Sequence, residues 1–100
     1  MLLDWLMELC EEFAFKRDTF HYAVNYIDRY LSCCMEVEKD DLQLIGVVCL
    51  CIAAKFEVKL NLIQEVQIPR SEEYVIATDN SYKLENFIQT EKIVLKVFYN

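Results

Sequence analysis

The stretch LQLIGVVCLCIAAKFE, residues 42–57, decides the fold of this 100-residue chain. Apolar side chains occupy almost every position from Leu44 to Ala54, so a helix formed here is apolar nearly all round. Such a helix must be surrounded by other helices, because it has no polar face to turn toward water. The run is shorter than the roughly 20 residues that a membrane span needs. We therefore expect a buried central helix and no membrane partner.

Helical spacing of apolar residues predicts four further helices around this one. They are expected over residues 1–13, from a cap at Asp18 or Thr19 to about residue 34, over 71–77, and from a cap at Ser81 to Phe98. The chain has only one Gly and one Pro, which argues against a turn-rich β-fold, and 55% of its residues are hydrophobic. The predicted fold class is all-α, a five-helix bundle with a central apolar third helix.

Composition excludes several classes of function. The net charge of −7 opposes binding to nucleic acid, whose phosphates are negative too. The five cysteines are odd in number and show no C-x-x-C spacing, so we predict free thiols in a reduced, intracellular setting and no metal site. With one histidine and one glycine, we find neither a general base beside a nucleophile nor a phosphate loop. The chain is therefore predicted not to be an enzyme and to use no cofactor.

Three charged residues interrupt the apolar patterns. Lys55 lies near the end of the central helix, Glu91 lies in the apolar stripe of the last helix, and Asp28 borders the stripe of the second. Isolated charges are costly to bury, so such residues usually pair with each other or with a second protein. The pattern allows an internal Lys55–Glu91 or Lys55–Asp28 bridge, or ions at a rim that meet a partner.

Four ordered motifs carry a family resemblance: LLDWLME at 2–8, AVNYIDRYLS at 23–32, LQLIG at 42–46 and AAKFE at 53–57. Thr78-Asp79 and VLKV at 94–97 continue the pattern. Together they resemble a cyclin box, most closely that of the A/B mitotic cyclins, over essentially the whole chain. The resemblance implies a regulatory subunit that binds and activates a cyclin-dependent kinase in cell-cycle control, acting in the nucleus and cytoplasm.

The resemblance also implies two surfaces. In the first, the third and fifth helices face the kinase: Lys55 and Glu91 match a charged pair that bonds it, and the residues matching apolar contacts are Ile52, Phe56 and Leu95. The second is a shallow groove that docks Arg-x-Leu segments of substrates or inhibitors, with a lining matched by Leu2, Trp5, Glu8, Leu42 and Gln43. Leu2, Trp5 and Glu8 are three residues apart, which places an apolar floor and a carboxylate on the same face of the first helix.

The chain departs from the family pattern at several places. The family's first helix normally begins about three residues earlier and includes an arginine that pairs with the residue matching Asp28. Val58 also replaces an acidic residue of the family. The segment from Val58 to Gln67 is about eight residues longer than is typical. We interpret residues 1–100 as a single cyclin box that lacks the family's N-terminal helix and second box. The alternative is a cyclin-fold adaptor in transcription, like general transcription factors or pocket proteins, that activates no kinase.

Overall fold

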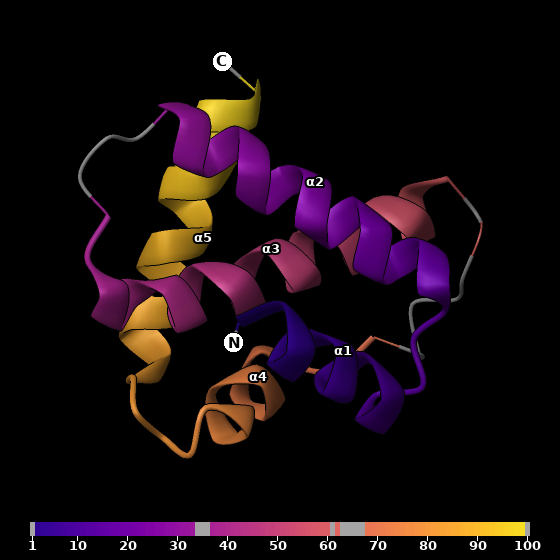
Figure 1. Ribbon diagram of the computed structural model, residues 1–100, viewed down its shortest axis with the longest axis horizontal. Coiled ribbons are helices and arrows are strands. Elements are labelled where there is room, and N and C mark those ends of the chain that lie inside the picture. The colour runs from indigo at the N-terminus through magenta and orange to yellow at the C-terminus, as the bar shows by residue number, and fades with distance from the viewer. Residues whose placement is uncertain (1, 34–36, 61, 63–67, 100) are drawn as a thin grey trace.

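Helix α3 (Lys39–Lys59) runs through the middle of the molecule. The computed structural model describes residues 2–33, 37–60, 62 and 68–99, without the side chains of residues 39, 40 and 99. In this part of the chain, four more helices surround α3, and each of them contacts it (Figure 1); they are α1 (Leu2–Glu12), α2 (Arg17–Cys33), α4 (Ser71–Ala77) and α5 (Leu84–Tyr99). This arrangement confirms the predicted all-α bundle of five helices with a central third helix.

Burial along α3 follows from its composition. Every residue from Leu44 to Ala54 other than Gly46 belongs to the apolar core and is at most 5% exposed. Surrounding helices add one buried stripe each, such as Leu6, Leu9 and Cys10 of α1. Among the described residues, no helix is long and apolar enough to cross a membrane.

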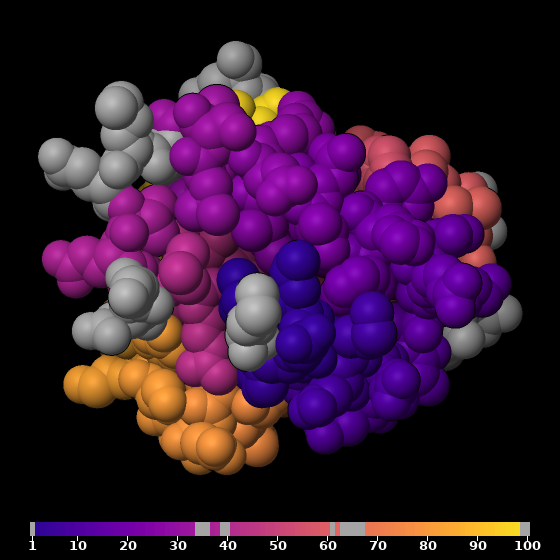
Figure 2. All heavy atoms as spheres, in the orientation of Figure 1, coloured from indigo at the N-terminus to yellow at the C-terminus, as the bar shows by residue number. Residues whose placement is uncertain are grey.

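Gly46 marks the closest approach between α1 and α3. A Cβ atom at this position would lie 3.1 Å from Leu2 Cδ1 and 3.4 Å from Leu6 Cδ1. A glycine inside a helix costs about 1 kcal/mol relative to alanine, and the close packing of another helix is the compensation here. The two helices therefore lie close enough to share a surface, as the atoms of α1 and of the first half of α3 do in Figure 2.

The chain turns out of α1 through Ala14, which has a positive φ of 58°. The Phe15 N–H donates to the Cys10 carbonyl at 2.8 Å, and the Ala14 N–H donates to the Glu11 carbonyl at 3.1 Å. This pair of bonds is the Schellman arrangement, which satisfies carbonyls that the helix itself leaves free. Glycine usually occupies the left-handed position, so Ala14 adopts it at a cost.

Three predicted helix starts were wrong. Helix α2 begins at Arg17, so Asp18 and Thr19 lie inside its first turn and not at a cap. Helix α5 begins at Leu84 rather than Ser81, because the Ser81 N–H and hydroxyl both donate to the Thr78 carbonyl and so close the turn after α4. Helix α3 begins at Lys39, three residues before the predicted Leu42, with Asp41 inside its first turn, where a carboxylate suits the helix dipole. The predicted irregular turn around residues 62–66 lies almost wholly outside the described residues.

The buried face of α2 also differs from the apolar stripe that helical spacing predicts for this helix, which is Phe20, Ala23, Val24, Ile27, Leu31 and Cys34. Its buried residues are Thr19, Ala23, Tyr26, Ile27 and Tyr30, whereas Phe20, Val24 and Leu31 are only half-buried. The aromatic rings explain the difference, since Tyr26 stacks on Phe98 of α5 with ring centroids 4.9 Å apart. Cys33 is exposed, and Cys34 lies outside the described residues.

Candidate functional site on helices α3 and α5

The five residues predicted to contact a kinase line one pocket of about 410 Å³ between α3 and α5. Helix α3 presents three of them at helical spacings of three and four, and α5 presents two that are four apart, so each set lies on one helix face. Two further residues from the end of α3 complete the lining. The full set is Ile52, Lys55, Phe56, Lys59, Leu60, Glu91 and Leu95.

Lys55 and Glu91 form an ion pair at the edge of this pocket. The Lys55 Nζ donates to Glu91 Oε2 at 2.8 Å, and the two side chains are 53% and 15% exposed. Of the two internal bridges that the sequence allowed, the Lys55–Glu91 bridge is therefore present. Its ammonium group still faces water, so the pair can meet a second protein. An exposed pair of this kind contributes at most about 1 kcal/mol to stability.

Interactions with Glu91 and Cys51 keep the side chain of Lys55 positively charged. Burial is the largest single influence and would lower the pKa of the ammonium group, but the hydrogen bond to the Glu91 carboxylate and the electrostatic interactions with Cys51 and Glu91 together outweigh it. The pKa of Lys55 therefore lies above its ordinary value of 10.5. At neutral pH Lys55 therefore places a positive charge at the rim of the pocket, beside the largely buried side chain of Glu91.

Cys51 supports the ion pair from the core side, a role that sequence reasoning missed. Its Sγ lies 3.6 Å from Glu91 Oε2, the same oxygen that accepts from Lys55. Burial raises the pKa of Cys51 to about 12, so the thiol stays protonated and can donate. The signal was present in the spacing, since Cys51 precedes Lys55 by one helical turn and so shares its face.

A second hollow lies on the other side of Lys55. This pocket, of about 870 Å³, separates the last turns of α3 from the segment that enters α4. It combines two basic side chains with one acidic side chain, and its lining is Cys51, Lys55, Val58, Ile68, Pro69, Arg70, Ser71 and Glu72. Lys55 therefore stands on a ridge between two depressions, where a partner can surround its ammonium group.

Glu57 is the second residue that the sequence analysis passed over. It follows Lys55 by two positions and is 1% exposed, so it points into the protein rather than toward the pocket. Its Oε1 accepts a short hydrogen bond from the buried Thr19 hydroxyl at the start of α2. Glu57 continues the core spacing of Leu50, Ala53 and Ala54, and that spacing is the signal for its burial.

The predicted docking groove falls on neighbouring faces of α1 and α3. Leu2 and Trp5 of α1 are half-buried, and Glu8, one turn later, is exposed. Leu42 and Gln43, in the first turns of α3, are half-buried as well. The contact of Gly46 with Leu2 places these two helices side by side. Leu2, Trp5 and Leu42 therefore expose part of their apolar surface, and Glu8 exposes its carboxylate. Docking of an Arg-x-Leu segment in this groove stays a prediction.

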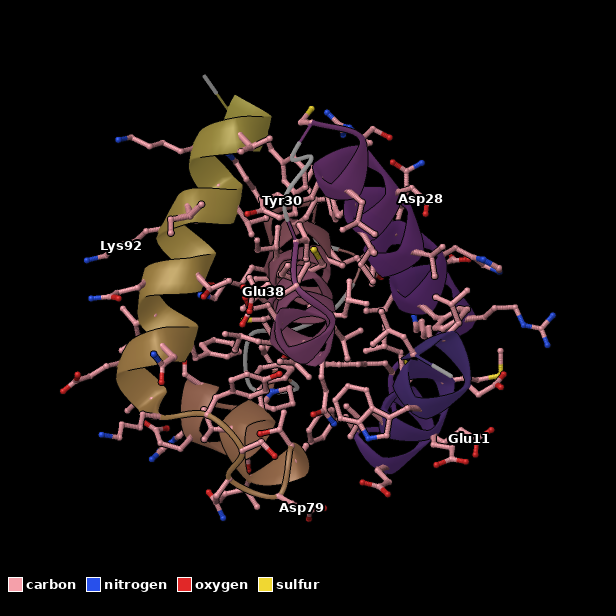
Figure 3. All side chains as sticks on the ribbon, turned by 60° about the vertical axis from the view of Figure 1, so that its left-hand side comes forward. Glu11, Asp28, Tyr30, Glu38, Asp79 and Lys92 are labelled. Atoms are coloured by element: carbon pink, nitrogen blue, oxygen red, sulfur yellow. The ribbon has the colours of Figure 1, made fainter. Side chains whose placement is uncertain are left out.

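Asp28 lies on the exposed side of α2 (Figure 3). The Lys55–Asp28 bridge that the sequence allowed is not formed, since Lys55 pairs with Glu91. The structural ion pair of Asp28 therefore stays a prediction.

No group of three His, Cys, Asp or Glu side chains in the described ranges is arranged to hold a metal ion. The thiols of Cys10 and Cys49 are buried too, and burial raises the pKa of Cys10 to about 11 and that of Cys49 to about 12. A protonated thiol in the core is a poor nucleophile.

Comparison with known proteins decides the family. The sequence pattern of the family described as "Cyclin, N-terminal domain" matches residues 1–99. The chain belongs to the cyclin N-terminal domain family. This assignment confirms the resemblance to a cyclin box.

Relatives of this cyclin domain come from animals and plants. It is 41% identical over 96 residues to the G1/S-specific cyclin-E of Drosophila melanogaster, which covers 96% of this chain and 13% of that protein. It is 41% identical over 97 residues to the cyclin-A2 of Homo sapiens, covering 97% and 21% of the two chains. The cyclin-A1-2 of Arabidopsis thaliana is 41% identical over 95 residues, covering 95% and 20%. The cyclin domain described here thus spans about a fifth or less of the length of these relatives.

Proposed function

We propose that this cyclin domain binds a cyclin-dependent kinase through the pocket between α3 and α5 and regulates it in cell-cycle control. One observation carries the proposal: the five residues expected to contact a kinase, scattered over residues 52–95, line a single pocket. The names of the relatives support the setting, since one is a G1/S-specific cyclin. The domain acts as a regulatory subunit without chemistry of its own, in the nucleus and cytoplasm.

The recognition chemistry has an apolar part and a charged part. Ile52, Phe56 and Leu95 offer an apolar floor on which a helix of the kinase can bury its own apolar face. The exposed ammonium group of Lys55 and the carboxylate of Glu91 lie at the edge, where charged groups fix register and orientation. A kinase conformer that fits both parts is stabilised relative to one that does not, which is how binding shifts a conformational equilibrium.

A test of this proposal uses the purified domain and a panel of cyclin-dependent kinases. We expect one or more kinases to co-elute with the domain on gel filtration and to gain activity toward a peptide substrate. Lys55→Ala combined with Glu91→Ala should weaken association while the helical circular dichroism signal stays unchanged. Absence of association with every kinase in the panel would overturn the proposal.

The matched control is Glu85→Ala combined with Lys92→Ala. Both residues are exposed on α5, neither lines the pocket, and this pair also removes one charge of each sign. Figure 3 shows Lys92 pointing away from α3. Kinase association should survive this control, and equal loss in both double variants would assign the effect to general destabilisation of α5.

We further propose that the groove between α1 and α3 docks Arg-x-Leu segments of substrates or inhibitors. The exposed carboxylate of Glu8 can meet the arginine, and the half-buried Leu2 and Trp5 can receive the leucine. A fluorescent Arg-x-Leu peptide should bind the domain, and Glu8→Lys should abolish that binding. The control Glu11→Lys makes the same charge change three residues further along α1, at an exposed position outside the groove. Equal weakening by both changes would contradict docking at Glu8.

A further inference from the structure

A third pocket, of about 340 Å³, lies on α5 away from the proposed kinase site. It is formed where α5 passes the end of α2 and the first turns of α3, and it shares no lining residue with the pocket around Lys55 and Glu91. Figure 3 shows the labelled Tyr30 and Glu38 close to the space between α3 and α5. The lining is Tyr30, Asp41, Leu44, Ile45, Tyr82, Asn86, Gln89, Thr90 and Ile93.

One wall of this pocket is a stripe along α5 with three polar residues and one apolar residue, Ile93. Asn86, Gln89, Thr90 and Ile93 recur at spacings of three, one and three, which places them on one helix face. Asn86 Oδ1 accepts from the Lys83 N–H at 2.9 Å, which fixes the amide at the start of the helix. Gln89 is exposed, and its amide has both a donor and an acceptor, the pair that an extended peptide backbone requires.

The opposite wall is apolar and ends in a negative charge. Leu44 and Ile45 of α3 are 5% and 4% exposed, and Ile93 faces them from α5 with 53% exposure. Asp41 is exposed one turn before Leu44, and in the described part of the chain its carboxylate joins no ion pair. Among the residues whose side chains the structure describes, no lysine or arginine lines the pocket, and the labelled Lys92 points away from it in Figure 3.

We propose that this groove binds a short extended segment of a partner protein in which a lysine or arginine stands next to an aliphatic residue. The basic side chain meets Asp41, the aliphatic side chain enters beside Leu44 and Ile93, and the Gln89 amide pairs with the peptide backbone. The charge of −7 steers such a cationic segment toward the domain. Because the two pockets share no residue, the segment can bind while a kinase occupies the other one.

The test is a titration of isotope-labelled domain with a defined peptide, followed by NMR. The probe is acetyl-Ala-Val-Lys-Val-Ala-amide, which lacks the Arg-x-Leu pattern, and its partner probe carries glutamate in place of lysine. We expect chemical-shift changes at the Asn86 and Gln89 amides and at the Ile45 and Ile93 methyl groups with the lysine peptide alone. Binding should weaken as salt rises, as an exposed ion pair requires.

Two substitutions and two controls localise the binding. Asp41→Asn removes the charge at nearly constant shape and should raise Kd about fivefold at low salt, and Gln89→Ala should raise it as well. Glu85→Gln removes an exposed charge of α5 outside the pocket and should leave Kd unchanged. The Lys55→Ala and Glu91→Ala double variant should also bind the peptide normally, which separates this site from the proposed kinase site.

Several outcomes would overturn the inference. Equal binding of the glutamate peptide would rule out recognition by Asp41, and shifts confined to the Trp5 indole would assign binding to the α1 groove. Shifts of Gln89 and Ile93 that grow with protein concentration in the absence of peptide would show that a second copy of the chain occupies the groove. Absence of any shift at millimolar peptide would leave the pocket without the proposed ligand.

Discussion

The Thr19 hydroxyl at the start of α2 donates a hydrogen bond to Glu57 Oε1 near the end of α3. Both residues are buried, at 0% and 1% exposure. Glu57 follows Phe56 directly, so this bond fixes the helical turn that presents Lys55 and Phe56 to the pocket. The proposed kinase surface is therefore held from behind by a contact with a different helix.

Removing the Thr19 hydroxyl should destabilise the domain. Thr19→Val keeps the shape of the side chain and leaves a buried carboxylate without this donor, which costs about 1–3 kcal/mol. Urea unfolding followed by circular dichroism measures the loss. Thr19→Ser retains the hydroxyl and should recover most of the stability, whereas equal stability of the two variants would contradict a contribution from the bond.

Replacing Ala14 by glycine should stabilise the domain. Ala14 has a φ of 58°, and a left-handed conformation costs a non-glycine residue about 1 kcal/mol, so Ala14→Gly should raise the free energy of unfolding by a similar amount. Thermal unfolding is a suitable measurement. Glu11→Gly, at an exposed helical position three residues earlier, should destabilise by about the same amount.

Alkaline pH should weaken the fold through its buried thiols. The pKa values of Cys10, Cys49 and Cys51 are raised from 9.0 to about 11, 12 and 12 by burial. Above pH 9 the unfolded chain therefore releases protons that the native state retains, and the free energy of unfolding falls until about pH 12. Each thiol contributes a slope of up to about 1.4 kcal/mol per pH unit in that range.

This pH dependence can be measured from urea midpoints between pH 8 and 10.5. Cys49→Ala should flatten the slope by the share of one thiol, at some cost in overall stability. Cys33→Ala, which changes an exposed cysteine, is the matched control substitution. An identical slope in the wild type and the Cys49 variant would contradict titration of buried thiols.

The fold could be predicted from the sequence because the composition of α3 is compatible with few arrangements. Its apolar run from Leu44 to Ala54 has to be enclosed, and the helical spacing elsewhere supplies helices to enclose it. Helix ends were less predictable, since Ser81 carries a typical capping side chain but bonds backward to Thr78 instead. A hydroxyl can serve either side of a turn, and only the folded geometry decides between them.

The sequence predicted the residues that line the candidate site, but not the residues that hold them in place. Lys55 and Glu91 stood out because they interrupt apolar patterns, and they are paired in the structure. Cys51 and Glu57 did not stand out. A cysteine in an apolar pattern looks like an ordinary small core residue, and a glutamate near a helix end is usually exposed to solvent. Their roles depend on contacts about 40 residues away in sequence, with Glu91 and Thr19, and the period of a single helix carries no information on those contacts.

An exchange of the two charges tests most directly whether the Lys55–Glu91 pair serves a partner. In Lys55→Glu combined with Glu91→Lys, the ion pair can form again within the domain, so unfolding in urea should change by no more than about 1 kcal/mol. The affinity for the kinase that binds the wild-type domain, measured by calorimetry, should nevertheless fall at least about tenfold, because reversed charges now face the partner. A charge-exchanged domain that binds this kinase as tightly as the wild type would contradict the account.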